Sequence, residues 1–292
     1  MHTLSISRKL FIGFNYVCLS LLATLCLIPL VHVLAISFSD PSASAAGLVK
    51  LWPVQFTSKS YEFVLSKPEF LISMSVSIKR LVLGSFINML LTVLIAYPLS
   101  KDAGKFRLRT FYAWFFVLTI LFYGGLIPQY MVVKSTGLLD TIWALVLPGA
   151  VPVFNMLLML NFFRNIPKDL EEAAFIDGAG YLRTLVSIYL PLSTPALATL
   201  TLFAMVFHWN SWFDGLIFMN TPINYPLQSY LQTMIIKLDM TNVTEEEMEL
   251  LKFVSNRSFK SAQIFLGALP ILLVYPFLQK YFVKGIMVGS VK

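Results

Sequence analysis

The sequence predicts an all-α integral membrane protein with six transmembrane helices. Apolar residues make up 57% of the 292 positions and charged residues only 13%, whereas a soluble protein carries about 25% charged residues. Six apolar stretches are long enough to cross a hydrocarbon core, which needs roughly 20 residues in a helix. The basic residues gather in short clusters between these stretches, which indicates membrane topology rather than a nucleic-acid-binding face.

Each predicted span lies between polar or charged segments. The expected spans are residues 10–38, 74–99, 110–133, 141–163, 192–219 and 261–283. Arg8 and Lys9 precede the first span, as in a signal peptide, but its apolar stretch is about twice as long as a typical signal-peptide core. We therefore expect it to be retained. Residues 1–292 are predicted to form a single transmembrane domain, with no further soluble domain in the loops.

The second span has the pattern of a helix packed inside a bundle. Small or weakly polar residues recur at every fourth position, which lets helices approach closely; they are Gly84, Asn88, Thr92 and Ala96. Near the outer end, Lys79 and Arg80 are expected to extend their charged groups toward the membrane surface. A uronate-binding role for these two residues is the alternative.

The third and fourth spans contain residues that break helices. Gly124, Gly125 and Pro128 lie in the third span, and Pro148, Gly149 and Pro152 lie in the fourth. Such breaks are tolerated where the backbone faces protein or a water-filled cavity. Each site is either a break of this kind or a simple packing kink.

The distribution of charge predicts that both termini are cytoplasmic. With the N-terminus inside, the inner segments hold twelve basic and five acidic residues, whereas the rest of the chain holds ten of each. The excess of Lys and Arg in the inner loops follows the positive-inside rule.

The inner loop 164–191 predicts a short helix, a turn and a second short element. Pro167 suits the start of a helix because its missing N–H costs nothing there, and the carboxylates that follow favour the positive end of the helix dipole. Gly178 is suited to end the helix in the left-handed conformation. A second element is expected from Tyr181 to Tyr189.

This loop presents a ridge of small residues flanked by carboxylates. Leu170, Ala173, Ala174 and Asp177 share one helical face. The shape suits insertion into a groove on another protein. The alternative is an amphipathic helix lying on the membrane, but such helices are usually rich in Lys and Arg, whereas this one is acidic and rich in Ala.

Several motifs resemble one family over nearly the whole chain. The loop is similar to the EAA loop of ABC-importer permeases in its residues Glu172-Ala173-Ala174, Asp177-Gly178-Ala179 and Ile188-x-Leu190-Pro191. Other stretches that resemble the carbohydrate permeases of the MalG-like class are Ile127-Pro128-x-Tyr130, Gly137-Leu138-x-Asp140-Thr141, His208 to Asp214, Gln279 to Gly285 and Gly289 to Lys292. Residues 123–128 look like a branch linked to plant-polysaccharide or uronate oligosaccharides.

The resemblance implies a type I ABC importer (MetI-like) permease fold in a bacterial cell membrane. It also implies that this subunit pairs with a second, homologous permease subunit, two ATPase subunits and an extracellular solute-binding protein that delivers an oligosaccharide. ATP and Mg would be used by the ATPase, and this chain would bind no cofactor, no metal and no nucleic acid and would catalyse no reaction.

The resemblance further assigns the loop to coupling with the ATPase. The residues concerned are Glu171, Glu172, Ala173, Ala174, Asp177, Gly178 and Ala179. Glu172 and Asp177 are expected to meet basic groups on the ATPase, and the small residues are expected to allow close docking. ATP binding and hydrolysis would then move the loop and the adjoining spans between inward- and outward-facing states.

Polar and aromatic residues in the fourth and fifth spans are candidates for a substrate pathway. They are Asn155, His208, Trp209, Asn210, Trp212 and Asp214. Amides and carboxylates can bond sugar hydroxyls, and indole rings offer flat apolar faces. Alternatively, the two Asn residues bond neighbouring helices and the two Trp residues belong to the interfacial belt.

The main rival function is an ion-coupled secondary transporter of a small polar solute. That class is expected to carry buried carboxylates and an internal repeat, and the deep part of the spans lacks both. The acidic outer segment 244–249 begins with a capping-box pattern and is expected to form a short exposed helix.

Overall fold

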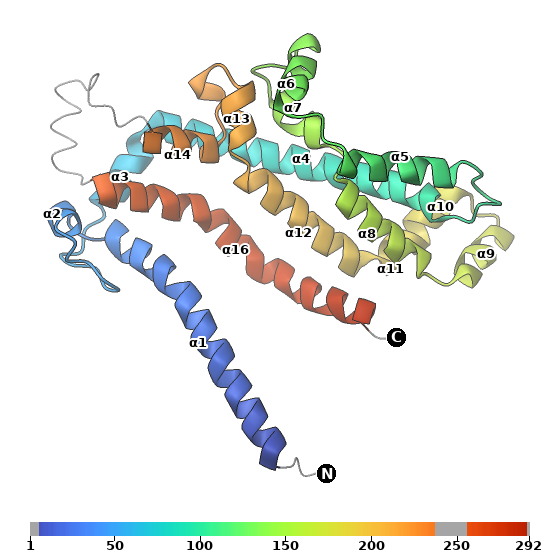
Figure 1. The fold of residues 1–292 in the computed structure, drawn as a ribbon, viewed down its shortest axis with the longest axis horizontal. Helices are drawn as coiled ribbons and strands as arrows, with labels where there is room; N and C mark the ends of the chain where they lie inside the picture. Colours follow the sequence, from blue (N-terminus) through green and yellow to red (C-terminus); the bar gives the residue numbers. More distant parts are fainter. Residues whose placement is uncertain (1–5, 237–255, 291–292) are drawn as a thin grey trace. The chain divides into compact units, whose positions relative to one another are not determined.

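The computed structural model describes residues 6–236 and 256–290. Within these ranges the chain is helical, and its only extended pairing is an isolated bridge between Ser39 and Phe56 (Figure 1). The acidic segment 244–249 lies outside the described residues.

The helices follow one another with short connections. In chain order they are α1 Ile6–Ser37, α2 Pro41–Ala45, α3 Lys59–Ser66, α4 Pro68–Ser100, α5 Arg109–Leu121, α6 Leu126–Ser135, α7 Ile142–Val146, η1 Leu147–Gly149, α8 Val153–Arg164, α9 Lys168–Ile176, α10 Tyr181–Thr184, η2 Leu185–Tyr189, α11 Leu190–Leu192, α12 Thr194–Asn210, α13 Phe213–Phe218, η3 Pro222–Asn224, α14 Leu227–Ile236 and α16 Asn256–Ser290. The segment η2 is a π-helical turn.

The chain divides into two compact units. The first comprises Met1–Pro68 and Ile236–Leu269, and the second comprises Glu69–Ile235 and Pro270–Lys292. In the first unit, the segment after α1 is held by aromatic contacts: the Phe38 ring stacks on Phe56 at 5.2 Å and lies 4.6 Å from Tyr61. The second unit contains every residue proposed above for ATPase coupling or the substrate pathway.

Within residues 6–236 and 256–290, three helices are long and apolar enough to span a membrane alone, and they lie in α1, α4 and α16. Three bent helix pairs also pass this test together: α5 with α6, α7 and η1 with α8, and α10 to α11 with α12. The predicted number of six spans is reached when each bent pair counts as one span.

The third predicted span, 110–133, is not one helix. The 13 residues of α5 reach about 20 Å, less than the roughly 30 Å hydrocarbon core. After the break, α6 leaves at 116°. Gly125 has a φ of 90°, which glycine adopts at little cost, and Pro128 lies in the first turn of α6. The break therefore falls at the residues where the sequence indicated one.

The fifth predicted span, 192–219, ends earlier than expected. The helix α12 stops at Asn210, and a separate short helix α13 begins at Phe213. The bend between these elements places Trp212 and Asp214 outside the straight helix. The helix in this predicted span is thus interrupted at Ser211 and Trp212.

The buried stripe of α4 matches its prediction. Gly84, Asn88, Thr92 and Ala96 all lie among the buried residues of this helix. A Cβ atom on Gly84 would come within 2.4 Å of the His208 ring, so the glycine permits close approach of α4 and α12. At the far end of α4, Tyr97 joins a core with α8 that includes Met156, Met159 and Phe163.

Candidate functional site

The 164–191 loop folds as the sequence predicts. Helix α9 follows Pro167, and Asp169 lies in its first turn. Gly178 has a φ of 78°, and the Ala179 amide donates to the Ala174 carbonyl at 2.9 Å, which closes the helix in a glycine-dependent C-cap. The second element from Tyr181 to Tyr189 is α10 followed by the π-helical turn η2.

The predicted coupling residues divide between two faces of α9. Glu171 points toward the segment that follows α4 and is only 4% exposed. Ala174 and Phe175 lie on the same face and are half-buried. The other face is exposed at Glu172, Ala173, Ile176, Asp177 and Gly178. Ala179 is half-buried. Glu171 is therefore not accessible to another protein in this structure, whereas Glu172 and Asp177 are.

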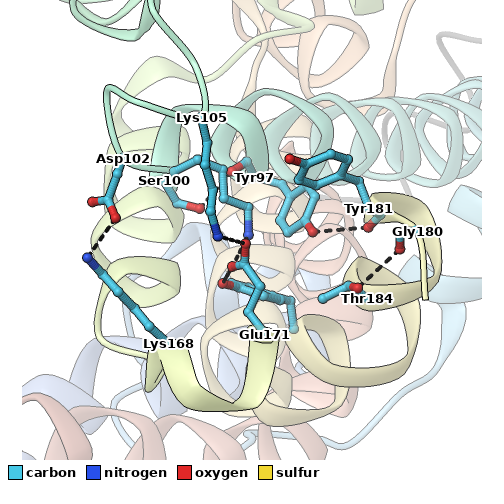
Figure 2. Close-up of polar contacts among 11 residues, drawn as sticks. Tyr97, Ser100, Asp102, Lys105, Lys168, Glu171, Gly180, Tyr181 and Thr184 are labelled. Carbon is cyan, nitrogen blue, oxygen red and sulfur yellow. Dashed lines mark hydrogen bonds and ion pairs between the residues drawn. The ribbon is translucent and has the colours of Figure 1, made fainter. Parts of the chain in front are cut away.

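The Glu171 carboxylate accepts hydrogen bonds from three side chains. Lys101 Nζ donates at 2.6 Å and the Tyr189 hydroxyl at 2.5 Å, both to Oε2, and Lys105 Nζ donates to Oε1 at 3.1 Å. Figure 2 shows Glu171 pointing from α9 toward Lys105 in the segment after α4. Together with Tyr97, we call these residues the Glu171 cluster.

Lys101 contacts two aromatic rings. Its Nζ is 3.9 Å from the ring centroids of both Tyr97 and Tyr189. The faces of aromatic rings carry partial negative charge and attract a cation at this distance. The buried ammonium group thus has a carboxylate and two rings as partners. They offset only part of the loss of its water shell, because burial still lowers the pKa of Lys101 despite the hydrogen bond to Glu171.

The environment of Glu171 favours its charged form. Burial alone raises the pKa of the carboxyl group, but the hydrogen bonds from Lys101, Tyr189 and Lys105 outweigh burial, and the net pKa is lowered. Glu171 therefore carries a negative charge at neutral pH, as the two lysine contacts require.

Two further contacts hold the loop at its edges (Figure 2). Lys168 forms an exposed ion pair with Asp102 at 2.7 Å, and the Tyr97 hydroxyl donates to the Tyr181 carbonyl at 3.0 Å. These bonds add to the buried Glu171 cluster and to the apolar core that joins Ile166, Leu185 and Tyr189 of the loop to the end of α4.

A second candidate site is a cavity of about 680 Å³ in the second unit. Its wall includes aromatic and polar side chains from three parts of the chain, among them Tyr123, Gln129, Phe207, Asn210, Trp212 and Asp214. A mainly apolar wall with a few polar groups is the usual composition of a ligand site. Three of the six predicted pathway residues, Asn210, Trp212 and Asp214, line this cavity.

The other three predicted pathway residues are buried away from the cavity. His208 and Asn155 are enclosed, and His208 Nε2 lies 2.8 Å from Asn88 Oδ1. The Asn88 amide in turn donates to the Gly149 and Ala150 carbonyls at 2.8 and 2.9 Å. Trp209 is buried beside an apolar pocket. In this conformation the His208 side chain bonds α4 rather than facing the cavity.

Asp214 is paired with Arg80 of α4. Arg80 Nη1 donates to Asp214 Oδ1 at 3.0 Å, and Nη2 contacts Oδ2. The arginine is 1% exposed and the aspartate 27%. The prediction that Arg80 extends toward the membrane surface is therefore wrong: the guanidinium is buried because a carboxylate from the α12–α13 bend neutralises it.

The sequence reasoning missed these charge partners. Lys101 and Lys105 were treated only as topology signals, and Arg80 was considered apart from Asp214. A signal existed for the second pair, because Asp214 is the one carboxylate in the predicted spans and a buried charge needs a partner. The lysine partners of Glu171, which lie 70 and 66 positions away, carry no comparable signal, because charged residues are ordinary in a loop outside the predicted spans. Among the described residues, no three His, Cys, Asp or Glu side chains form a possible metal site.

Comparison with known proteins identifies the family of this chain. The family model described as the binding-protein-dependent transport system inner membrane component matches residues 80–288. Protein LplC of Bacillus subtilis is 41% identical over 91% of this chain and 89% of its own. The polygalacturonan/rhamnogalacturonan transport system permease protein YtcP of the same organism is 38% identical over 98% and 99%.

A solved structure has the same fold over almost the whole chain. It is that of a bacterial ABC transporter involved in the import of the acidic polysaccharide alginate, with a TM-score of 0.88 and 33% identity over 97% of this chain and 100% of that one. These similarities confirm the prediction of an all-α, multi-pass bacterial membrane protein.

Proposed function

We propose that this chain, which belongs to the family of inner membrane components of binding-protein-dependent transport systems, is one permease subunit of an ATP-driven oligosaccharide importer. A second permease subunit, two ATPase subunits and an extracellular binding protein complete the transporter. The ATPase subunits use ATP and Mg, and this chain supplies the pathway without binding a cofactor or catalysing a reaction. Both termini and the 164–191 loop lie in the cytoplasm, where the excess of Lys and Arg favours them.

The observation that carries this proposal is the exposed face of α9. The carboxylates of Glu172 and Asp177 are accessible on either side of Ala173, which leaves room for another protein's backbone or side chains to approach. Ile176 adds an apolar contact, since 86% of its surface is exposed. A small, acidic and partly apolar helix suits a groove lined by basic groups on an ATPase.

The cavity suits a saccharide. The Trp212 ring offers a flat apolar face, and Asn210 offers an amide for hydroxyl groups. The Asp214 carboxylate would repel an acidic sugar, but Arg80 neutralises it. This arrangement, together with relatives that are named for alginate and polygalacturonan, supports an oligosaccharide substrate that can include uronate units.

The experiment that tests the proposal is the ATPase activity of the reconstituted complex. We expect wild-type activity to require the ATPase subunits and to rise with binding protein and sugar. Glu172→Ala should abolish this stimulation or release the ATPase subunits, because it removes an exposed docking carboxylate.

A matched control is Asp169→Ala, which removes another exposed carboxylate from α9 that is not among the predicted coupling residues. It should retain at least half of the stimulation. Sugar uptake by Glu172→Ala at the wild-type rate, or uptake by the wild type without any ATPase, would contradict the proposal and favour the secondary transporter.

A further inference from the structure

Two adjacent carboxylates of α9 have opposite surroundings. Glu172 is exposed, whereas Glu171 is buried and bound by three side chains of the same chain. We propose that Glu171 is a positioning residue that fixes α9 to the end of α4 and to the turn before α12. Because of this attachment, movement of α9, which we call the docking helix, also moves the adjoining spans. This inference rests on the proposed function, because it concerns how the docking helix transmits its motion.

The donors to Glu171 come from two separate segments. Lys101 and Lys105 belong to the segment directly after α4, and Tyr189 belongs to the π-helical turn that leads through α11 into α12. One carboxylate on α9 therefore joins the docking helix to both segments. A π-helical turn within a helix is uncommon and is frequent at functional sites, and here it contains the tyrosine that bonds Glu171.

The other side-chain attachments of α9 are one ion pair and the contacts of Phe175, whose ring lies 5.1 Å from that of Tyr181 and 5.3 Å from Lys105 Nζ. The Lys168–Asp102 pair is exposed on both sides, and exposed ion pairs contribute little. The helix has nine residues, too few to be stable on its own in water. Gly178, directly after α9, can change its backbone conformation at little cost, because glycine has few conformational restrictions. Without the Glu171 cluster, α9 could tilt at this glycine while remaining bound to a partner.

The cluster also specifies one geometry. Both carboxylate oxygens accept hydrogen bonds, and the Lys101 ammonium contacts the rings of both Tyr97 and Tyr189, which themselves meet edge to face with centroids 5.0 Å apart. Burying such a charge pair does not stabilise a protein more than apolar packing does. A defined position for α9 is a better explanation for placing ions here than stability is.

The test compares two isosteric variants, Glu171→Gln and Glu172→Gln, in the reconstituted complex. The readout is the amount of sugar transported per ATP hydrolysed, which a loss of stability alone does not change. For Glu171→Gln we expect the ATPase subunits to co-purify and hydrolysis to continue, with the transport ratio reduced about fivefold or more. Glu172→Gln should instead weaken co-purification and lower hydrolysis and transport together.

The outcomes separate the two proposals. A wild-type transport ratio in assembled Glu171→Gln would overturn the positioning role and leave the proposed function intact. Parallel loss of hydrolysis and transport in this variant would also overturn it, since Glu171 would then act in docking itself. Sugar transport by Glu172→Gln at the wild-type rate would instead contradict the proposed function.

A second variant covers the case in which Glu171→Gln does not assemble. Lys105→Met removes only the outer donor, whose side chain is 40% exposed, and leaves Lys101 and Tyr189 in place. We expect it to assemble normally with a transport ratio about twofold lower than wild type. An unchanged ratio in assembled Lys105→Met would overturn the inference.

Discussion

Two charge clusters tie α4 to later parts of the chain, and they differ in how the anion is placed. In the Glu171 cluster the anion is enclosed together with one of its two cations, Lys101, and only the second cation, Lys105, is partly exposed. In the Arg80–Asp214 pair the cation is the enclosed group, and the carboxylate lies on the wall of the cavity. The first cluster fixes the 164–191 loop to α4, and the second fixes the bend between α12 and α13 to α4.

The difference indicates which charge can exchange its partner. The Glu171 carboxylate has little surface to offer a new partner, because its side chain is 5% exposed and both of its oxygens already accept hydrogen bonds. Asp214 is 27% exposed and can meet groups of a molecule in the cavity while still bonded to Arg80. The closed cluster around Glu171 suits the transmission of motion between helices. The half-open pair of Arg80 and Asp214 suits the wall of a cavity in which the carboxylate contacts a passing substrate.

The largest effect on stability is expected when the buried Arg80 loses the carboxylate of Asp214. Asp214→Asn leaves the Arg80 guanidinium buried without an anion, which should lower the free energy of unfolding by about 3 kcal/mol. Arg80→Met leaves a carboxylate that cavity water can solvate, so we expect a loss of only about 1 kcal/mol. Denaturant titration in detergent measures both values.

The double variant Arg80→Met/Asp214→Asn is the control for this asymmetry. Since it removes the unpaired charge, it should be more stable than Asp214→Asn alone. If Arg80→Met were the more damaging single change, the view that the cation is the enclosed partner would be wrong.

A smaller effect is expected for the wall of the cavity. Trp212→Ala removes a flat apolar face, and we expect the sugar concentration that half-saturates uptake to rise about tenfold, or roughly 1.4 kcal/mol. Co-purification of the ATPase subunits should not change, because the 164–191 loop is untouched. The measurement is uptake into proteoliposomes with saturating binding protein.

Trp114→Ala is the matched control for this prediction. Trp114 is an exposed tryptophan of α5 that is not among the residues of the cavity wall. Equal shifts in the two variants would assign the effect of Trp212 to membrane packing rather than to the sugar.

Local patterns predicted the elements that depend on neighbouring residues. The start of α9 after Pro167, its end at Gly178 and the breaks near Gly125 and Gly149 all follow from the conformational limits of proline and glycine. The buried stripe of α4 follows from helical periodicity. These features need no knowledge of the rest of the fold.

The features that were missed depend on contacts between distant segments. The bend after Asn210 contains neither proline nor glycine, and the Arg80–Asp214 bond that holds it joins residues 134 positions apart. Glu171 and Glu172 have the same side chain and adjacent positions, so composition cannot tell them apart. Their different exposure is decided by which face of α9 meets the end of α4.

The smallest expected effect concerns the pH dependence of the closed cluster. The pKa of Glu171 is lowered in the folded chain, because its hydrogen bonds outweigh burial. Its contribution to stability should therefore be complete above the unfolded pKa of about 4.3 and should decline as pH falls through the lower folded pKa. The difference in melting temperature between wild type and Glu171→Gln, measured in detergent, should stay constant from about pH 8 to 5 and narrow below about pH 4. A difference that widens on acidification would mean that Glu171 is protonated in the fold, and the lysine contacts could not then hold α9 as an ionic cluster.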